Sequence, residues 1–359
     1  MKITLLGAEV GSKTSGESRF LINLAVGLRN EGVDVSLAAT AVHPEAMATL
    51  RAQGVTVFAL GPFTERGASK ALLLTTRSHV GRDVARRAVV EVPGDWYVVV
   101  SDAAVDASMY LPRGQSAYIS NGDLGLMLLS DSFYSTHRLS KSLLALGTSR
   151  LIRRNAAFAQ RYEVLVANSE FSRGLMSYLY STPFQAVVYP PVDCSTFYPE
   201  TCGQSVDSYV LAMTRNSNEQ GLPLLEKLAE LTDLHVVGGA NIRGAQSLGV
   251  VSDSHLRREY SQALFTIIPV VSEPFGYAVA ESLACGTPVL AFNSCGPAEQ
   301  IQDSQSGWLV STHAEALAKA SSLIRTGVPL EMRISARKRS ERFSMRESAQ
   351  GLIRVLRRI

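Results

Sequence analysis

Short apolar runs alternate with amphipathic segments along most of the chain. Runs such as 3–7, 34–38 and 96–100 are rich in Val, Ile and Leu, as buried strands are. Between the first two runs, apolar residues recur at helical spacing over 18–30, and Gly32 follows the last turn. Alternation of strands and helices predicts a parallel sheet with helices on both of its faces.

The same alternation continues through the second half of the chain, so two sheets are expected. The predicted strands are 3–7, 34–38, 55–60, 96–100, 117–120, 164–167 and 186–189, then 209–213, 235–239, 264–269 and 289–292. A length of 359 residues suits two domains of ordinary size. We expect the first over 1–190 and the second over 191–345, joined at 189–193, where two prolines favour an extended backbone.

The segment 272–289 carries the most specific pattern in the chain. It follows the predicted strand 264–269, and Pro274 and Gly276 then break the chain before a short amphipathic helix. A Gly-Thr-Pro sequence ends that helix just before the strand 289–292. The loop between the first strand and the helix therefore faces the carboxyl edge of a parallel sheet, where ligands bind in open α/β folds.

Two carboxylates accompany this loop, Glu273 before the helix and Glu281 within it. The start of the helix offers backbone N–H groups near Phe275, Gly276 and Tyr277, which suit a phosphate group. Gly lets the backbone approach an anion closely. The alternative is a helix with one acid at its positive end and another on its solvated face. That alternative leaves the Pro-Phe-Gly and Gly-Thr-Pro sequences around the pair unexplained.

The segment 273–289 resembles the Glu-x7-Glu signature of retaining glycosyltransferases of the family 4 type. The resemblance extends to Gly296-Pro297-Ala298-Glu299 and to Gly307–Val310, with Cys295 where the family usually has Gly. It implies the GT-B fold, an α/β architecture of two Rossmann-like domains facing across a cleft. It also implies that the C-terminal helix, 346–359, packs back on the first domain.

The resemblance implies a role for each matching residue. Glu273 would bind the transferred sugar, Glu281 would hold the ribose hydroxyls, and Arg215 would stabilise the departing nucleoside diphosphate. Glu273 and Arg215 are thus the expected catalytic residues. Gln220 stands where the family has Lys, and it can donate a hydrogen bond but adds no charge. The residues expected to bind the donor are Gly16, Arg215, Gln220, Glu273, Phe275, Gly276, Tyr277 and Glu281.

The first half matches the family less closely. The loop 12–17 resembles the family's Gly-Gly-x-Glu loop, with Ser15 in place of one Gly. Many relatives carry a His after the strand that matches 117–120, where this chain has Ser120 and Asn121. Asn can bind a sugar hydroxyl but is no general base. A retaining front-face reaction does not need one, because the leaving phosphate can accept the proton. We expect Ser15, Ser120 and Asn121 on the acceptor side.

Composition excludes several classes of protein. A net charge of +3 without a nucleic-acid-binding motif gives no reason to expect a nucleic-acid partner. The four cysteines form no CxxC pair and predict reduced thiols in a cytoplasmic protein. No Asp-x-Asp motif or zinc-ligand spacing is present, so neither a metal nor a cofactor is expected. Residues 1–7 suit a first strand rather than a signal peptide, and no apolar run is long enough to span a membrane.

Two segments are basic, 66–87 and 137–161, and the second contains no acid. Leucines interleave with its arginines, a pattern that suits an amphipathic helix lying on an anionic membrane at the inner face. A solvated basic face on a helix of a soluble protein explains the pattern equally well. Both interpretations remain open at this point.

The sequence thus predicts a metal-independent enzyme that moves a sugar from a UDP- or GDP-linked donor to a glycan or lipid-linked acceptor, with retention. A non-catalytic GT-B protein that binds a nucleotide sugar or a partner subunit is the alternative. A Rossmann oxidoreductase is a second alternative, but 7–11 after the first strand lacks the GxGxxG motif.

Overall fold

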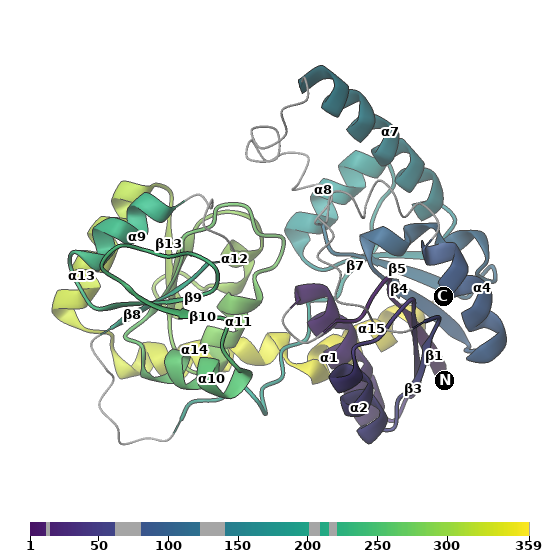
Figure 1. Ribbon diagram of the computed structural model, residues 1–359, viewed down its shortest axis with the longest axis horizontal. Helices are drawn as coiled ribbons and strands as arrows, with labels where there is room; N and C mark the ends of the chain where they lie inside the picture. Colours follow the sequence, from purple (N-terminus) through teal and green to yellow (C-terminus); the bar gives the residue numbers. More distant parts are fainter. Residues whose placement is uncertain (12–14, 62–79, 123–140, 201–208, 215–220, 359) are drawn as a thin grey trace. The chain divides into compact units, whose positions relative to one another are not determined.

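The computed structural model describes residues 1–11, 15–61, 80–122, 141–200, 209–214 and 221–358 (Figure 1). The chain divides into two compact units, Met1–Pro191 with Met345–Ile359 and Val192–Ser344. The first unit ends at Pro191, one residue after the boundary expected at 190. Each unit contains one parallel sheet, so the prediction of an α/β protein with two parallel sheets is confirmed.

The first sheet has the strand order β3-β2-β1-β4-β5-β6-β7, and every neighbouring pair is parallel. Its strands are β1 (Lys2–Leu6), β2 (Asp34–Ala39), β3 (Thr56–Ala59), β4 (Trp96–Val100), β5 (Ser116–Ser120), β6 (Val164–Ala167) and β7 (Ala186–Val187). The order reverses between β1 and β4. Such a switch point opens a crevice at the carboxyl ends of the two strands, where ligands bind in folds of this kind.

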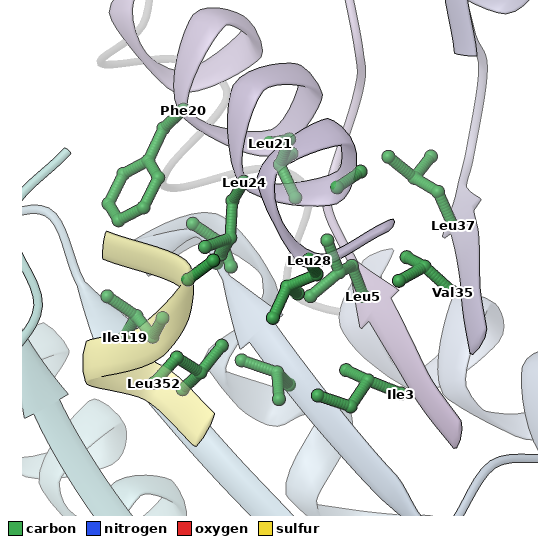
Figure 2. Packing of buried hydrophobic residues seen from close by; sticks show 14 of the residues in the cluster. Ile3, Leu5, Phe20, Leu21, Leu24, Leu28, Val35, Leu37, Ile119 and Leu352 are labelled. Carbon is green, nitrogen blue, oxygen red and sulfur yellow. The ribbon is translucent and has the colours of Figure 1, made fainter. Parts of the chain in front are cut away.

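Helices of the first unit cover this sheet. They are α1 (Gly16–Asn30), α2 (Pro44–Ala52), α4 (Val80–Glu91), α7 (Lys141–Ala159), α8 (Glu170–Tyr180) and α15 (Met345–Leu356), with the 3-10 helix η1 (Asp102–Met109). The C-terminal helix α15 lies beside α1 (Figure 1). Figure 2 shows Leu352 of α15 among Leu24, Leu28 and Ile119. Gly27 permits the approach, because a Cβ there would lie 2.7 Å from the Met345 carbonyl oxygen.

The second sheet repeats the arrangement, with the order β10-β9-β8-β11-β12-β13 and a reversal between β8 and β11. Its strands are β8 (Val210–Met213), β9 (Leu234–Val237), β10 (Gln246–Gly249), β11 (Thr266–Ile268), β12 (Val289–Phe292) and β13 (Gly307–Val310). The edge strands β10 and β13 were not predicted. An edge strand pairs on one side only, and β10 is a polar four-residue segment without the apolar run of a central strand.

The helices of the second unit are tied together by arginines of α14. These helices are α9 (Leu222–Ala229), α10 (Asp253–Gln262), α11 (Tyr277–Ala284), α12 (Cys295–Gln300), α13 (His313–Thr326) and α14 (Leu330–Ser340), followed by the 3-10 helix η2 (Glu341–Phe343). Arg333 donates to the Ala263 carbonyl after α10, and Arg337 donates to the Ala284 carbonyl at the end of α11. Each bond satisfies a carbonyl that has no partner within its own helix.

Candidate functional site

The carboxyl ends of β8 and β11 meet at the switch point of the second sheet. Thr214 directly follows β8, and Pro269 directly follows β11. Gly221, in the left-handed region at φ 102°, packs so tightly there that a Cβ would lie 2.6 Å from the Pro269 carbonyl oxygen. Arg215 and Gln220 lie outside the described residues, so their proposed roles remain predictions.

The turn after β11 presents Glu273 and Gly276 at this edge. Glu273 is 9% exposed. Gly276 is the N-cap of α11 and has φ 90°, a conformation that glycine adopts without the steric cost of a side chain. The ring of Phe275 is buried, with its centroid 5.4 Å from that of Tyr277 and 5.8 Å from that of Phe343. Since its ring is packed inside the protein, Phe275 can contact a ligand through its backbone.

Glu281 lies on the buried side of α11. It is 4% exposed, and the Tyr260 hydroxyl donates to its carboxylate across 3.5 Å. The alternative in which Glu281 lies on a solvated helix face is therefore wrong. A buried carboxylate needs hydrogen-bond donors to offset its lost hydration. Glu281 is thus held inside the protein within two turns of the Gly276 cap.

The helix α12 closes the other side of the turn. The Gly296 N–H donates to the Glu273 carbonyl across 2.9 Å, and a Cβ at Gly296 would lie 2.4 Å from the Pro274 carbonyl oxygen. Cys295 has φ 52°, in the left-handed region that favours glycine. This backbone conformation explains why Gly suits position 295 better than Cys. A cysteine at this position therefore holds a backbone conformation that costs it energy.

The turn and the start of α11 together suit an anion. An N-terminal helix end carries N–H groups without intrahelical acceptors and a partial positive charge. The Gly276 N–H donates to no acceptor within the part of the chain that the structure describes. With Glu273 in the turn and Glu281 in α11, the arrangement offers donors for a phosphate and acceptors for hydroxyl groups.

The first unit places two of its predicted residues at the start of α1. Ser15 is the N-cap of this helix: its Oγ accepts from the Ser18 N–H at 3.1 Å and donates to the Ser18 Oγ at 2.7 Å. Gly16 is the first residue of the helix and is exposed. The Ser15 side chain therefore has a structural role as a cap, whichever ligand the loop meets.

Asp102 is a buried residue that sequence analysis missed. It follows β4 at the switch point of the first sheet, and one of its carboxylate oxygens, Oδ1, accepts three hydrogen bonds. The donors are the Tyr118 hydroxyl at 2.6 Å, the Ser120 hydroxyl at 2.9 Å and the Asn121 N–H at 3.2 Å. The signal that could have found it is an Asp two residues after a buried strand, at the carboxyl edge of the sheet.

The two predicted residues at the carboxyl end of β5, Ser120 and Asn121, differ in which groups they can present to a ligand. The Ser120 hydroxyl donates to Asp102, and the Asn121 carbonyl accepts from Asn168 Nδ2 at 2.8 Å. Asn121 is 8% exposed, and its side-chain oxygen has no hydrogen-bond partner among the described residues. An unpaired buried carboxamide oxygen retains its capacity to accept a hydrogen bond. Asn121 is therefore the better acceptor-side candidate of the two.

The Tyr118 hydroxyl is the strongest donor to Asp102. Burial, with the negative charge of Asp102 beside it, raises the pKa of Tyr118 well above its usual range, so the hydroxyl stays protonated. A hydrogen bond to a charged acceptor contributes about 1.5–3 kcal/mol, against about 0.5–1.5 kcal/mol for a neutral pair. We expect Tyr118→Phe to lower the free energy of unfolding in urea by about 1.5–3 kcal/mol.

Tyr162 offers a matched control for this prediction. Its ring stacks on that of Tyr118 at 5.4 Å, and its hydroxyl donates to the neutral Val105 carbonyl at 3.0 Å. Tyr162→Phe also removes one buried hydroxyl, so it should cost only about 0.5–1.5 kcal/mol. Equal losses in the two variants would contradict a special contribution from Asp102.

The described residues contain no group of three or more His, Cys, Asp or Glu side chains that could hold a metal ion. Burial raises the pKa of the Cys285 and Cys295 thiols, which keeps them protonated at neutral pH. Cys202 lies outside the described residues. The thiols of Cys285 and Cys295 are therefore poor nucleophiles and poor metal ligands.

The second unit contains a segment that matches a known protein family. Residues 242–341 match the family model described as glycosyl transferases group 1. A protein of Saccharomonospora viridis named D-inositol 3-phosphate glycosyltransferase is 27% identical over 406 aligned positions, covering 97% of this chain and 90% of that one. D-inositol 3-phosphate glycosyltransferase 2 of Catenulispora acidiphila is 26% identical, covering 83% of this chain and 78% of that one.

Solved structures resemble the whole chain. HepE of Anabaena in complex with UDP superposes with a TM-score of 0.73 at 17% identity, covering 100% of both chains. Sucrose-phosphate synthase of Thermosynechococcus elongatus gives a TM-score of 0.75 at 16% identity, covering 100% of this chain and 98% of that one. The chain thus has the GT-B fold. The family match and the sequence relatives support a glycosyltransferase with this fold.

Proposed function

We propose that this chain is a retaining glycosyltransferase of the family 4 type, which transfers a sugar from a UDP- or GDP-linked donor to a glycan or lipid-linked acceptor. One observation carries the proposal: Glu273, the left-handed Gly276 and the buried Glu281 lie on one strand–turn–helix unit. That unit falls inside the matched segment 242–341. Support for a nucleotide-linked donor comes from HepE, whose structures hold UDP and UDP-glucose.

Each residue of the unit has a proposed role. The N–H groups at Gly276 and Tyr277 bind the diphosphate, and Arg215 and Gln220 add donors to it. Glu281 accepts hydrogen bonds from the ribose hydroxyls. Glu273 binds the transferred sugar and stabilises the positive charge that develops at its anomeric carbon.

The first unit supplies the acceptor side in this proposal. Asn121 accepts a hydrogen bond from an acceptor hydroxyl, and Asp102 holds the Asn121 backbone in place through the bond to its N–H. Ser15 and Gly16 lie at the start of α1 and contribute backbone groups. The nucleophilic hydroxyl loses its proton to the leaving phosphate, so no enzyme base is required.

The proposal is tested by incubating the protein with UDP- and GDP-linked hexoses and measuring release of the nucleoside diphosphate, with and without a candidate acceptor. We expect turnover of one donor class, faster with an acceptor. Rates should be equal with EDTA, because the described residues contain no cluster of side chains that could hold a metal ion. Loss of activity in EDTA with rescue by Mn²⁺ would contradict metal independence. Absence of turnover with tight nucleotide binding would favour the alternative function below.

A non-catalytic nucleotide-sugar-binding protein is the second candidate. The specific observations that favour it are Asn121, where many family members have His, and Gln220, where they have Lys. The pair of buried carboxylates Glu273 and Glu281 favours catalysis, because a carboxylate held beside the turn can stabilise positive charge that develops on the transferred sugar.

The protein is further proposed to act in the cytoplasm, with a peripheral contact to anionic lipid through α7. Arg150 and Arg153 of this helix are exposed, whereas Ile152 packs against the core of the first unit. Among the described residues, no helix is long and apolar enough to cross a membrane. Any contact through this part of α7 would therefore rest on charge rather than on insertion of Ile152.

This contact predicts binding to vesicles that contain anionic lipid. Each basic residue near an anionic surface contributes about 1 kcal/mol, so Arg150→Glu with Arg153→Glu should weaken binding by at least about 30-fold. The control, Arg325→Glu with Lys338→Glu, changes the charge equally at exposed positions of the second unit. Equal binding to neutral and anionic vesicles in a sedimentation assay would leave the solvated basic face as the correct interpretation.

A further inference from the structure

Gln300, the last residue of α12, is fully buried with 0% exposure. Its side-chain Nε2 donates to the carbonyl oxygens of Phe275 and Gly276, the second across 3.3 Å. These two carbonyls belong to the turn that carries the proposed diphosphate-binding N–H groups. The amide of Gln300 thus contacts the carbonyl oxygens of the turn and not its N–H groups.

Because the peptide bond is planar, these contacts to the two carbonyls also fix the direction in which the next N–H groups point. In a trans peptide the C=O and the following N–H point to opposite sides. With the Phe275 carbonyl held toward Gln300, the Gly276 N–H points away from Gln300. The same relation holds between the Gly276 carbonyl and the Tyr277 N–H. The Gly276 carbonyl also accepts from Val279 at 3.0 Å, so the effect of Gln300 falls mainly on the Phe275–Gly276 peptide.

Other contacts hold α12 itself against the turn. The Ser294 hydroxyl donates to the Val271 carbonyl at 2.6 Å, and the Gly296 N–H donates to the Glu273 carbonyl at 2.9 Å. At the other end of α12, Arg339 donates to the carbonyls of Gln300 at 2.8 Å and Glu299 at 2.7 Å. The Gln300 backbone is therefore held in place by α14, which fixes the position from which its side chain extends toward the turn.

One atom of the Gln300 side chain lowers the stability of the folded protein. Its Oε1 atom is buried and has no hydrogen-bond partner among the described residues. An unpaired buried acceptor destabilises a protein, and an apolar side chain of similar size would avoid that penalty. An apolar side chain would also remove the donor to the Phe275 and Gly276 carbonyls, so the glutamine at this position is explained by its bonds to the turn rather than by packing.

We propose that Gln300 is a positioning residue, which aims the Gly276 and Tyr277 N–H groups at the diphosphate of the donor. This inference rests on the proposed function, because it assumes that the turn binds a nucleoside diphosphate. Gln300 does not touch the donor. It holds the Phe275–Gly276 peptide in the orientation that keeps its N–H available, so the turn is ready before the ligand arrives.

The test compares affinities for a nucleoside diphosphate and for its nucleoside in the wild type, Gln300→Leu and Gln300→Met. UDP and GDP are screened by calorimetry, and the one that the wild type binds is used with uridine or guanosine. We expect both variants to lose diphosphate affinity by about tenfold, since the turn loses oriented donors to a charged group, with nucleoside affinity unchanged. Two variants are used so that one that fails to fold does not end the test.

Gln302→Leu is the matched control. Gln302 is exposed and lies two residues further along, so the same change there should leave both affinities unaltered. If diphosphate and nucleoside affinities fall together in the Gln300 variants, or only the melting temperature falls, Gln300 is merely structural and the inference is wrong. If the wild type binds neither nucleoside diphosphate, the proposed function itself fails. The two failures are therefore distinguishable.

Discussion

Replacing Glu273 by Gln is expected to lower the rate of sugar transfer about 100-fold, because an oriented charge at the reacting centre is lost. Glu273 is nearly buried beside the start of α11, where water screens its charge weakly. A carboxylate there stabilises the positive charge that develops on the departing sugar. Gln keeps the shape and the hydrogen-bonding oxygen but removes that charge. The nucleoside diphosphate lacks the transferred sugar that Glu273 would contact, so its affinity should be nearly unchanged.

The experiment measures kcat for transfer and Kd for the nucleoside diphosphate in both proteins. Glu331→Gln is the control, since Glu331 is exposed on α14 and the substitution changes the net charge equally. A loss of kcat with unchanged Kd places the role of Glu273 in the transition state. Unaltered kcat would remove Glu273 from the catalytic machinery, and an equal loss in Glu331→Gln would point to a general charge effect.

Replacing Glu281 by Ala is expected to raise the Kd of the nucleoside diphosphate by about 10- to 150-fold, which corresponds to losing about 1.5–3 kcal/mol of charged hydrogen bonding. Glu281 is buried and oriented by the Tyr260 hydroxyl at 3.5 Å. A carboxylate held in this way accepts hydrogen bonds from ribose hydroxyls without first losing conformational freedom.

A 2′,3′-dideoxy nucleoside diphosphate makes this test specific for the ribose contact. It should bind the wild type more weakly than the natural ligand, and Glu281→Ala should weaken it little further, because the contact is already gone. Tyr260→Phe serves as a second variant, which keeps the carboxylate and removes only its donor. Equal penalties for the two ligands in Glu281→Ala would show that Glu281 supports the fold rather than the ribose.

Local features of the site could be predicted from the sequence because they depend on neighbouring residues. The positive φ at Gly276 follows from a Gly between an extended turn and a helix. Ser169, a residue type typical of the N-cap, precedes α8, and its Oγ accepts from the Ser172 N–H at 3.0 Å. The central strands were found because burial on both faces produces continuous apolar runs.

The contacts of Asp102 and Gln300 could not be predicted, because their partners are distant in sequence. Asp102 meets Tyr118, Ser120 and Asn121 only because β4 and β5 are parallel neighbours. The pairing of these strands brings their carboxyl ends together, which no local pattern reveals.

The sequence by itself determined the α/β alternation, the turn around Gly276 and the presence of two carboxylates there, since spacing and residue type act within a few positions. Only the tertiary structure decided that Glu281 is buried rather than solvated, and that Gln300 lies against the Phe275 and Gly276 carbonyls. Amphipathic spacing identifies one face of a helix, but which neighbours cover it depends on packing between elements far apart in the chain. Burial and charge, which set the chemistry of a carboxylate, arise from that packing.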